Sequence, residues 1–313
     1  KVITSAMGID SGLANINTTF TCAGAYGVAK ETYHCAGHKA HGTITLAEAL
    51  RQSCNIYYIQ LGQRIGSQTF YDYFDAFGFT SRTGVDLPNE TNFMQYYKAD
   101  QLGEVQLASS AFGQAMAITP LQMCTAVAAA VNGGYLVTPH VVDKITDANG
   151  NVIEEIGANV HRQVISESTS NVIRQIMEYE VGNGTGGGKY AYVSGYRIGG
   201  KSGTSEQLNM DRRTDGDYKK VASFAAVLPA DDPEIIVYVM LDDPNNAKTD
   251  YSSLLAAPVV GNIISEVAPY LGIATDGEDR SGTTVTVPNL VGTEWSSAQV
   301  QLNIKGLKHQ LAE

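Results

Sequence analysis

The chain has 313 residues and a formal net charge of −11, with 43 % hydrophobic and 17 % charged residues. This composition supplies enough apolar side chains for one large domain or two smaller ones, and it argues against global disorder. The acidic balance argues against binding to nucleic acid or to an anionic lipid surface, because both need a basic field. No run of apolar residues approaches the roughly 18 that span a bilayer, and we recognise no signal peptide.

The first third of the chain is predicted to be mainly helical. Residues 1–9 carry apolar side chains at helical spacing with no preceding cap, so residue 1 is predicted to lie inside a helix whose first turn is missing. Residues 14–42 are polar and glycine-rich. Thr45 and Glu48 form a capping box that predicts a short helix, and a longer one is expected over 55–65.

The middle of the chain alternates between helices and turns. Thr119 followed by Pro120 is a strong helix start, and the helix is expected to stop at about residue 131, before Asn-Gly-Gly. Residues 135–165 are predicted to form a hairpin that turns at Asn149-Gly150. The other segments expected here are an aromatic helix over 70–77, loops with short strands over 78–104, and a helix over 167–181.

The C-terminal half is predicted to carry the sheet. Residues 182–188 are interpreted as a flexible glycine-rich loop. Strands are expected at about 190–205, 221–228 and 234–241, the last two antiparallel across a tight turn, followed by a helix over 256–271. We interpret 1–271 as one domain, 272–284 as a polar linker and 285–313 as the beginning of another module.

A literal phosphate-loop pattern, G-x-x-x-x-G-K-S, runs from Gly195 to Ser202. Such a loop must open a helix, whereas the residues after Ser202 lack an apolar helical stripe and no alternation of strands and helices surrounds them. An NTPase therefore stays only a remote alternative.

Cysteines and histidines gather in the polar segment. Cys22 and the run His34-Cys35-x-x-His38-x-x-His41 resemble zinc ligands in type, but their spacing fits no standard finger. A disulfide between Cys22 and Cys35 and a pair of free thiols are both favoured over zinc, so no metal is assigned. Cys54 and Cys124 stand in apolar helical contexts and are interpreted as core residues.

Two short motifs suggest serine acyl chemistry. Ser53-Cys54-Asn55 lies where two predicted helices meet, and Lys201-Ser202-Gly203-Thr204 lies on a predicted strand. A hydrolase of the S-x-x-K class needs a nucleophilic serine, a lysine base one turn later, a relay serine with an amide, and a cationic strand edge that holds a carboxylate. A glycine in that strand lets a substrate backbone approach closely. Taken singly, these residues would more often be a helix cap and a solvated lysine.

With these motifs in place, the sequence resembles, along its whole length, the transpeptidase domain of a class B penicillin-binding protein. The stretches that carry the resemblance are TLAEALRQSCN (45–55), FGFTSRTGVDLPNE (77–90), AFGQAMAITPLQM (111–123), GGKSGTSE (199–206), SFAAVLPADDPEIIVYVMLDDP (223–244) and AAPVV (256–260). Residues 285–307 resemble the first half of a PASTA module, which implies the Gram-positive form of the family. The resemblance implies an α+β fold of the β-lactamase/transpeptidase type: a five-stranded, mainly antiparallel sheet flanked by helices, an all-helical lobe, and the site between them.

The resemblance also implies roles for individual residues. Lys1 matches the lysine of S-x-x-K and would be the general base, so the nucleophilic serine is expected three residues before it, outside this chain. Ser53 would relay a proton to the leaving amine and Asn55 would bind the donor peptide. Lys201, Ser202 and Thr204, with Gly203, would bind the terminal carboxylate of a D-Ala-D-Ala stem peptide or of a β-lactam. The Thr204 N–H would supply one oxyanion donor. The polypeptide as it stands is expected to fold but not to be acylated by penicillin.

The function expected from these motifs is a peptidoglycan D,D-transpeptidase that works through a serine acyl-enzyme and needs no cofactor. Expected partners are stem peptides, β-lactams, and glycosyltransferase and division or elongation machinery, at the extracytoplasmic face of a membrane reached through an N-terminal anchor absent from this chain. The alternatives are a non-catalytic cell-wall sensor and a D,D-carboxypeptidase or β-lactamase. The PASTA-like tail argues against the carboxypeptidase and β-lactamase.

Overall fold

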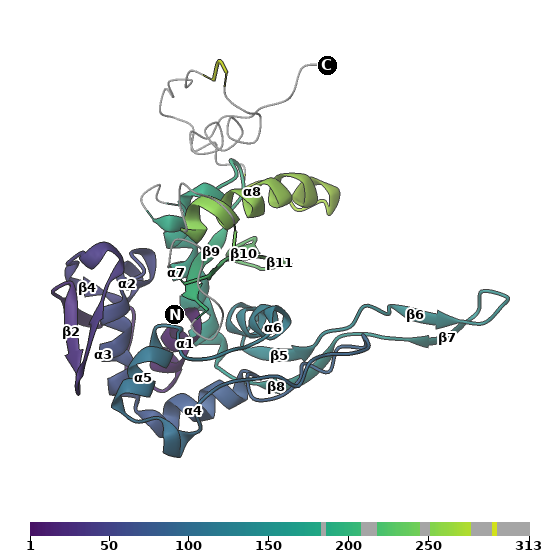
Figure 1. The fold of residues 1–313 in the computed structure, drawn as a ribbon. Coiled ribbons are helices and arrows are strands. Elements are labelled where there is room, and N and C mark those ends of the chain that lie inside the picture. The colour runs from purple at the N-terminus through teal and green to yellow at the C-terminus, as the bar shows by residue number, and fades with distance from the viewer. Residues whose placement is uncertain (183–185, 208–217, 245–250, 277–289, 293–313) are drawn as a thin grey trace. The chain divides into compact units, whose positions relative to one another are not determined.

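The computed structural model describes residues 1–182, 186–207, 218–244, 251–276 and 290–292 (Figure 1). The chain divides into two compact units, each described here by itself. The first comprises Lys1–Ala49 and Cys54–Ile173, and the second comprises Leu50–Ser53 and Arg174–Glu313. All of the predicted module at 285–313 except residues 290–292 lies outside the described residues.

Packed helices form the core of the first unit. Their bounds are α1 (Val2–Asp10), α3 (Asn55–Ile65), α4 (Ser67–Ala76), α5 (Glu104–Ala111) and α6 (Pro120–Val131), while α2 (Leu46–Arg51) crosses into the second unit; η2 (Ala99–Gln101) is a short 3-10 turn. Helix α3 is central and contacts α1, α4 and α5. A Cβ at Gly62 of α3 would lie 2.4 Å from the Ala111 Cβ, so the glycine allows α3 and α5 to pack closely.

The helix limits follow local signals that the sequence displays. The predicted capping box at Thr45 is present, since the Thr45 N–H donates to the Glu48 side chain. The predicted helix start at Thr119 also forms a capping box, in which the Thr119 N–H donates to the Gln122 side chain. Helix α3 spans the predicted residues and stops at a Gly66 with φ of 80°. Helix α5 is not predicted from the sequence, because no capping side chain marks its start. Its four buried residues are mostly small, so they form no clear apolar stripe.

The polar segment 14–42 contains strands, so the expectation of an all-helical lobe is wrong. Strand β1 (Thr19–Cys22) pairs antiparallel with β4 (Gly42–Thr45), and β2 (Ala25–Val28) pairs with β3 (Glu31–His34); η1 (Ala36–His38) follows β3. Each strand has four residues and few apolar side chains, so the alternation that predicts a strand is absent. These short ladders bring distant cysteines together.

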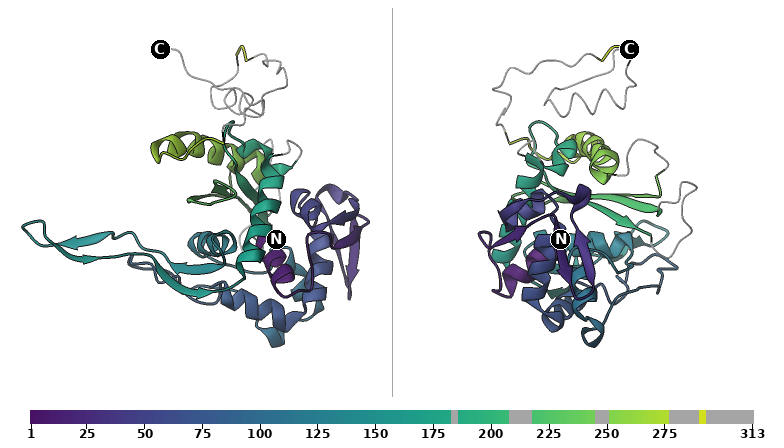
Figure 2. Two further views of the ribbon diagram at one scale, coloured as in Figure 1. Left: turned by 180° about the vertical axis from the view of Figure 1, so that it is seen from behind. Right: turned by 60° about the vertical axis from the view of Figure 1, so that its left-hand side comes forward.

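The predicted hairpin over 135–165 is confirmed and has two parts. Strand β5 (Tyr135–Thr138) pairs with β8 (Asn159–Gln163), and β6 (Lys144–Thr146) pairs with β7 (Val152–Glu155) nearer the tip. The tip turns at Gly150, with φ of 86°. The views from two sides show β6 and β7 as the outer part of one long arm (Figures 1 and 2).

The second unit holds a three-stranded antiparallel sheet in the order β11-β10-β9. Its strands are β9 (Gly199–Glu206), β10 (Lys220–Leu228) and β11 (Ile235–Asp242). Helix α7 (Glu167–Gly182) enters from the first unit, and η3 (Gly187–Ala191) and α8 (Ser252–Tyr270) complete the unit. The described residues therefore account for three of the five strands expected, and the predicted antiparallel pairing of the last two is confirmed.

Helix α8 packs along this sheet (Figure 1). Its buried face meets side chains from β10 and η3; these residues are Ala256, Val260, Ile264, Phe224, Leu228 and Ala191. Helix α8 has 19 residues and an 18-residue window with a mean hydropathy of 1.2, so among the described helices it is the one long and apolar enough to cross a membrane. The contacts with the sheet identify α8 as a core helix of this unit.

One sequence interpretation in this unit is wrong. Residues 190–198 are not a strand: they complete η3 and a turn, because Gly195 has φ of 81° and the extended backbone starts only at Gly199. Of the glycine-rich stretch 182–188, residues 183–185 lie outside the described residues, and Gly186 and Gly188 are buried. A Cβ at Gly186 would lie 2.3 Å from the Glu180 carbonyl oxygen, so these glycines allow the chain to pack against α7.

Candidate functional site

Strand β9 positions Lys201 at an edge of the sheet. Lys201 pairs with Ala225 of β10, and no described strand pairs with the opposite edge of β9. A Cβ at Gly200 would lie 2.6 Å from the Phe224 ring, so the glycine allows the strand to lie flat on the core. Along β9, Lys201 is buried, Ser202 is half-buried, and Gly203 and Thr204 are exposed. The strand therefore runs from the core to an accessible edge within four residues.

The Lys201 ammonium is held inside the unit by a carboxylate. Lys201 Nζ lies 3.6 Å from Glu180 Oε1 of α7 and donates to Ser202 Oγ at 3.1 Å. The side chains of Lys201 and Glu180 are 8 % and 0 % exposed. Burial raises the pKa of Glu180 to about 7, although the charge of Lys201 pulls it down. Burial lowers the pKa of Lys201, and the Glu180 charge opposes this shift. Lys201 is thus no solvated edge lysine.

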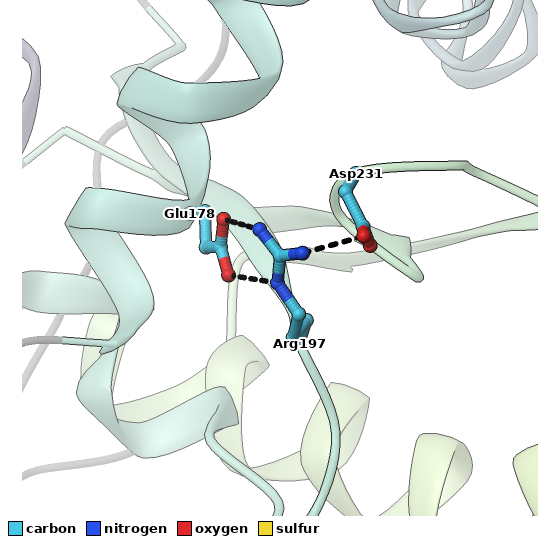
Figure 3. Close-up of polar contacts among 3 residues, drawn as sticks. All are labelled: Glu178, Arg197 and Asp231. Carbon is cyan, nitrogen blue, oxygen red and sulfur yellow. Dashed lines mark hydrogen bonds and ion pairs between the residues drawn. The ribbon is translucent and has the colours of Figure 1, made fainter. Parts of the chain in front are cut away.

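A salt bridge fixes β9 relative to α7, as Figure 3 shows. The Arg197 guanidinium donates two hydrogen bonds of 2.8 Å to the Glu178 carboxylate and another to Asp231 in the β10–β11 turn. Such a planar fork constrains both direction and distance. Because Glu178 precedes Glu180 by two residues and Arg197 precedes Lys201 by four, this contact helps to bring Lys201 to Glu180.

Thr204 links the exposed end of β9 to the start of α8. Thr204 Oγ1 hydrogen-bonds the Ser252 hydroxyl and accepts from the Ser252 N–H at 3.3 Å. Ser252 is 2 % exposed. The contact satisfies an N–H in the first turn of α8, as a capping residue would, so Thr204 has a structural role besides any role toward a ligand.

Ser53 has an unusual backbone conformation. Its φ is 51°, in the left-handed region that a residue with a side chain seldom adopts. Its N–H donates to the Leu50 carbonyl at 3.1 Å, and the nearby Arg51 lies over the Tyr179 ring of α7 at 5.6 Å. Strain of this kind persists where the surroundings enforce it, and it gathers at functional sites.

In the first unit, Asn55 is part of helix α3 and Lys1 lies beside that helix. Lys1 Nζ donates to the Phe112 carbonyl at 3.1 Å and lies 5.9 Å from the centre of the Tyr58 ring. Asn55 is the first residue of α3, and its Nδ2 donates to the His34 carbonyl at 3.1 Å. Because Tyr58 follows Asn55 by three residues, the two share a helix face, and Lys1 lies along that face.

Cys22 and Cys35 lie close enough to bridge, as predicted, but the structure forms no disulfide between them. Their Sγ atoms are 3.6 Å apart, whereas a disulfide needs about 2.05 Å. Cys54 joins them: it is buried, as predicted for a core residue, and its Sγ also lies 3.6 Å from that of Cys35. Their contact lowers the pKa of Cys35 to about 5 and, together with burial, raises the pKa of Cys54. His41 reaches the cluster and His38 does not.

Sequence reasoning missed three participants in these clusters: Glu180, Ser252 and Cys54. Glu180 and Ser252 contact residues of β9 that are distant in the sequence, Lys201 and Thr204. No local sequence pattern indicates such partners. The phosphate-loop alternative is excluded, because Ser202 lies inside β9 and the adjacent sheet is antiparallel.

Comparisons with known proteins agree with these features. The family described as "Penicillin binding protein transpeptidase domain" matches residues 1–265. The chain is 34 % identical to Stage V sporulation protein D of Bacillus subtilis over 97 % of its own length and 48 % of that protein. It is 32 % identical to a probable peptidoglycan D,D-transpeptidase FtsI of Caulobacter vibrioides over 92 % and 48 %. The chain thus spans about half the length of these curated relatives.

Solved structures show the same fold. Penicillin binding protein 3 of Mycobacterium tuberculosis, in a crystal structure with aztreonam, superposes with a TM-score of 0.77 and 27 % identity, over 89 % of this chain and 62 % of that one. The fold is therefore of the β-lactamase/transpeptidase type that the sequence motifs predict. On the family match and on the relative that is 34 % identical, the chain belongs to the penicillin-binding protein transpeptidase family.

Proposed function

We propose that this chain is the catalytic domain of a peptidoglycan D,D-transpeptidase. The observation that carries the proposal is the buried Lys201, paired with Glu180 and bonded to Ser202, on a strand whose outer edge has no described partner. A cation fixed beside open backbone groups suits a peptide that ends in a carboxylate, because the strand edge bonds the peptide and the cation bonds its terminus. Family membership supports the same function.

The proposed binding site for the terminal carboxylate follows β9. Ser202 Oγ accepts a hydrogen bond from Lys201, so its own proton points elsewhere and is available to a carboxylate oxygen. Gly203 has no side chain to block a substrate backbone. The Thr204 hydroxyl is engaged with Ser252, so we assign its N–H, rather than its side chain, to the oxyanion that forms at the scissile carbonyl.

The proposed reaction is acyl transfer in two steps. Lys1 takes the proton of a nucleophilic serine three residues before it, and that oxygen bonds to the carbonyl carbon of the penultimate D-Ala while the C–N bond breaks. Ser53 relays a proton to the departing D-Ala amine, and Asn55 hydrogen-bonds the donor peptide. In the second step the amine of a neighbouring stem peptide displaces the serine oxygen and completes the cross-link.

In this scheme a β-lactam mimics the donor peptide. When its ring opens, the amine that leaves the carbonyl stays attached to the acyl group and does not depart from the acyl-enzyme. The complexes of the Mycobacterium tuberculosis protein with aztreonam and with ampicillin support this ligand class. Because the substrate is peptidoglycan, we place the activity at the extracytoplasmic face of the membrane, together with glycosyltransferase and division or elongation proteins.

The test is covalent labelling by a fluorescent penicillin, read by intact-protein mass spectrometry. The protein used is this chain extended by three residues so that Ser stands three before Lys1, which we call the extended chain. We expect one adduct per molecule, at least a tenfold slower acylation in Lys201→Ala, and no change in Lys144→Ala on the hairpin arm.

The outcomes separate the proposal from its rivals. An extended chain that binds penicillin reversibly but forms no adduct is a non-catalytic binding module. Release of free D-Ala from a stem-peptide analogue with no cross-linked product, even with an acceptor amine present, identifies a carboxypeptidase. Either result overturns the transpeptidase proposal.

A further inference from the structure

Four side chains of the types that bind metals meet in the first unit, from positions spread over residues 22–54. Cys22 ends β1, Cys35 follows β3, His41 precedes β4, and Cys54 is the N-cap of α3. Their ligand atoms, three sulfurs and one imidazole nitrogen, all lie within 4.8 Å of one another. Cys22, Cys35 and Cys54 are 1 %, 3 % and 0 % exposed, and His41 is half-buried. The cluster is thus enclosed by the fold.

The distances between the ligand atoms match those around a tetrahedral ion. A zinc ion with Zn–S bonds of about 2.3 Å holds its sulfur ligands about 3.8 Å apart, and a sulfur and an imidazole nitrogen about 3.6 Å apart. The Sγ atom of Cys35 lies 3.6 Å from each of the other two, and His41 Nδ1 lies 3.3 Å from Cys22 Sγ. A disulfide would use only two of the three thiols, and the third would remain in contact with it without a partner of its own.

The surroundings suit thiolates. Cys54 Sγ accepts a hydrogen bond of 3.4 Å from the Tyr57 N–H in the first turn of α3, and the amino end of a helix favours negative charge. The short β1–β4 ladder holds two of the ligands, since the His41 N–H donates to the Cys22 carbonyl at 3.1 Å. Three thiolates and one imidazole are ligands that zinc prefers, whereas magnesium and calcium prefer oxygen.

We propose that Cys22, Cys35, Cys54 and His41, through Nδ1, hold a structural zinc ion. Four protein ligands complete a tetrahedral shell and leave no position for water, so the ion has a structural, not a catalytic, role. On binding, the three thiols lose their protons to solvent and form Zn–S bonds, with no oxidation or reduction.

The position of Cys54 gives the ion a consequence for the serine chemistry. Cys54 is the central residue of Ser53-Cys54-Asn55, and its neighbour Ser53 has the left-handed φ of 51°. A zinc ion that ties Cys54 to β1 and β3 holds this tripeptide in place from outside the helix. This consequence rests on the proposed function, whereas zinc binding does not.

The test measures the metal content of the 313-residue chain, purified under reducing conditions without chelator, by inductively coupled plasma mass spectrometry. We expect one zinc per chain and at least a tenfold loss of zinc affinity in His41→Ala and Cys35→Ser. The matched controls are His38→Ala and Cys124→Ser, which lie outside the cluster and should retain the full content. Removal of the ion by a chelator should lower the melting temperature, and zinc should restore it.

Cobalt provides a readout that does not depend on a variant folding. The wild-type chain, freed of metal by a chelator, is titrated with Co²⁺. This should produce the visible bands of a tetrahedral site and a sulfur-to-cobalt charge-transfer band, and both should be lost on adding one equivalent of zinc. Absence of these bands in reduced protein overturns the inference, as does mass spectrometry that finds Cys35 disulfide-bonded in freshly purified protein. An extended chain that is acylated normally without zinc contradicts the positioning role, and one that holds zinc but is never acylated contradicts only the proposed function.

Discussion

Glu180→Gln is the substitution that most directly tests the buried ion pair. Gln keeps the volume and the hydrogen-bonding shape of the carboxyl group but removes its charge beside Lys201. The usual result of removing one partner from a buried pair is a loss of about 3–5 kcal/mol. We expect the opposite sign at neutral pH, because the pKa of Glu180 is raised despite its cationic neighbour. Ionised Glu180 therefore costs stability.

The magnitude follows from linkage between protonation and folding. The pKa of Glu180 is about 7 in the folded chain against an ordinary value of 4.5. A raised folded pKa contributes stability that is fully present below pH 4.5 and is lost as the pH rises through 7. At about 1.36 kcal/mol per pH unit, the wild type loses about 3 kcal/mol over this window, and the Gln variant loses none of it.

The assay is urea unfolding of both proteins at pH 5 and pH 7.5. The variant should gain about 2.5 kcal/mol relative to the wild type between the two pH values. Glu178→Gln is the matched control, since Glu178 stands on the same helix and binds Arg197 instead; it should not be more stable than the wild type at pH 7.5. A Glu180→Gln variant that is several kcal/mol less stable at pH 7.5 would refute the reasoning.

The same substitution should change the pH profile of the extended chain. Glu180 opposes the effect of burial on the pKa of Lys201, so its loss lowers that pKa further. The alkaline limit of penicillin acylation should therefore move to lower pH in Glu180→Gln and stay in place in Glu178→Gln. Higher stability combined with a narrower pH range would identify Glu180 as a positioning residue.

Two further substitutions test packing around these sites. Gly188→Ala places a Cβ 1.9 Å from Glu180 Oε2, so it should slow acylation of the extended chain at least tenfold, whereas Gly187→Ala meets its nearest atom at 3.4 Å and should be tolerated; equal effects of the two would contradict the packing described. Ser5→Ala removes the 2.8 Å hydrogen bond to the fully buried Tyr58 hydroxyl and should cost about 1–3 kcal/mol in urea unfolding, most of it recovered when Tyr58→Phe is added. A cost that persists in the double variant would place the effect elsewhere.

The elements predicted from sequence are those whose signals lie within a few residues. Helix α3 begins after Cys54 and stops at Gly66, and α6 begins with its Thr119 capping box. The long hairpin turns at Gly150. In each case a cap, a proline or a glycine with positive φ decides the boundary locally.

The elements that the sequence failed to predict depend on distant partners. Strands β1 to β4 have four residues each, and they exist because their backbones pair across the polar segment. Helix α5 has no start signal, and Gly62 of α3 supplies the close surface against which it packs. In the glycine-rich stretch, the burial of Gly186 and Gly188 against α7 is likewise not indicated by the sequence.

By itself, the sequence determined the family, the order of most elements and the residues that carry the proposed chemistry, since S-x-N and K-S-G-T are contiguous motifs that need no partner to be recognised. Only the tertiary structure decided how their charges are arranged. Glu180 approaches Lys201 because α7 packs beside β9, and Cys54 meets Cys22, Cys35 and His41 because two short ladders fold onto α3. Contacts between residues that are more than ten positions apart in the sequence depend on tertiary packing, and the local spacing of residues does not indicate that packing.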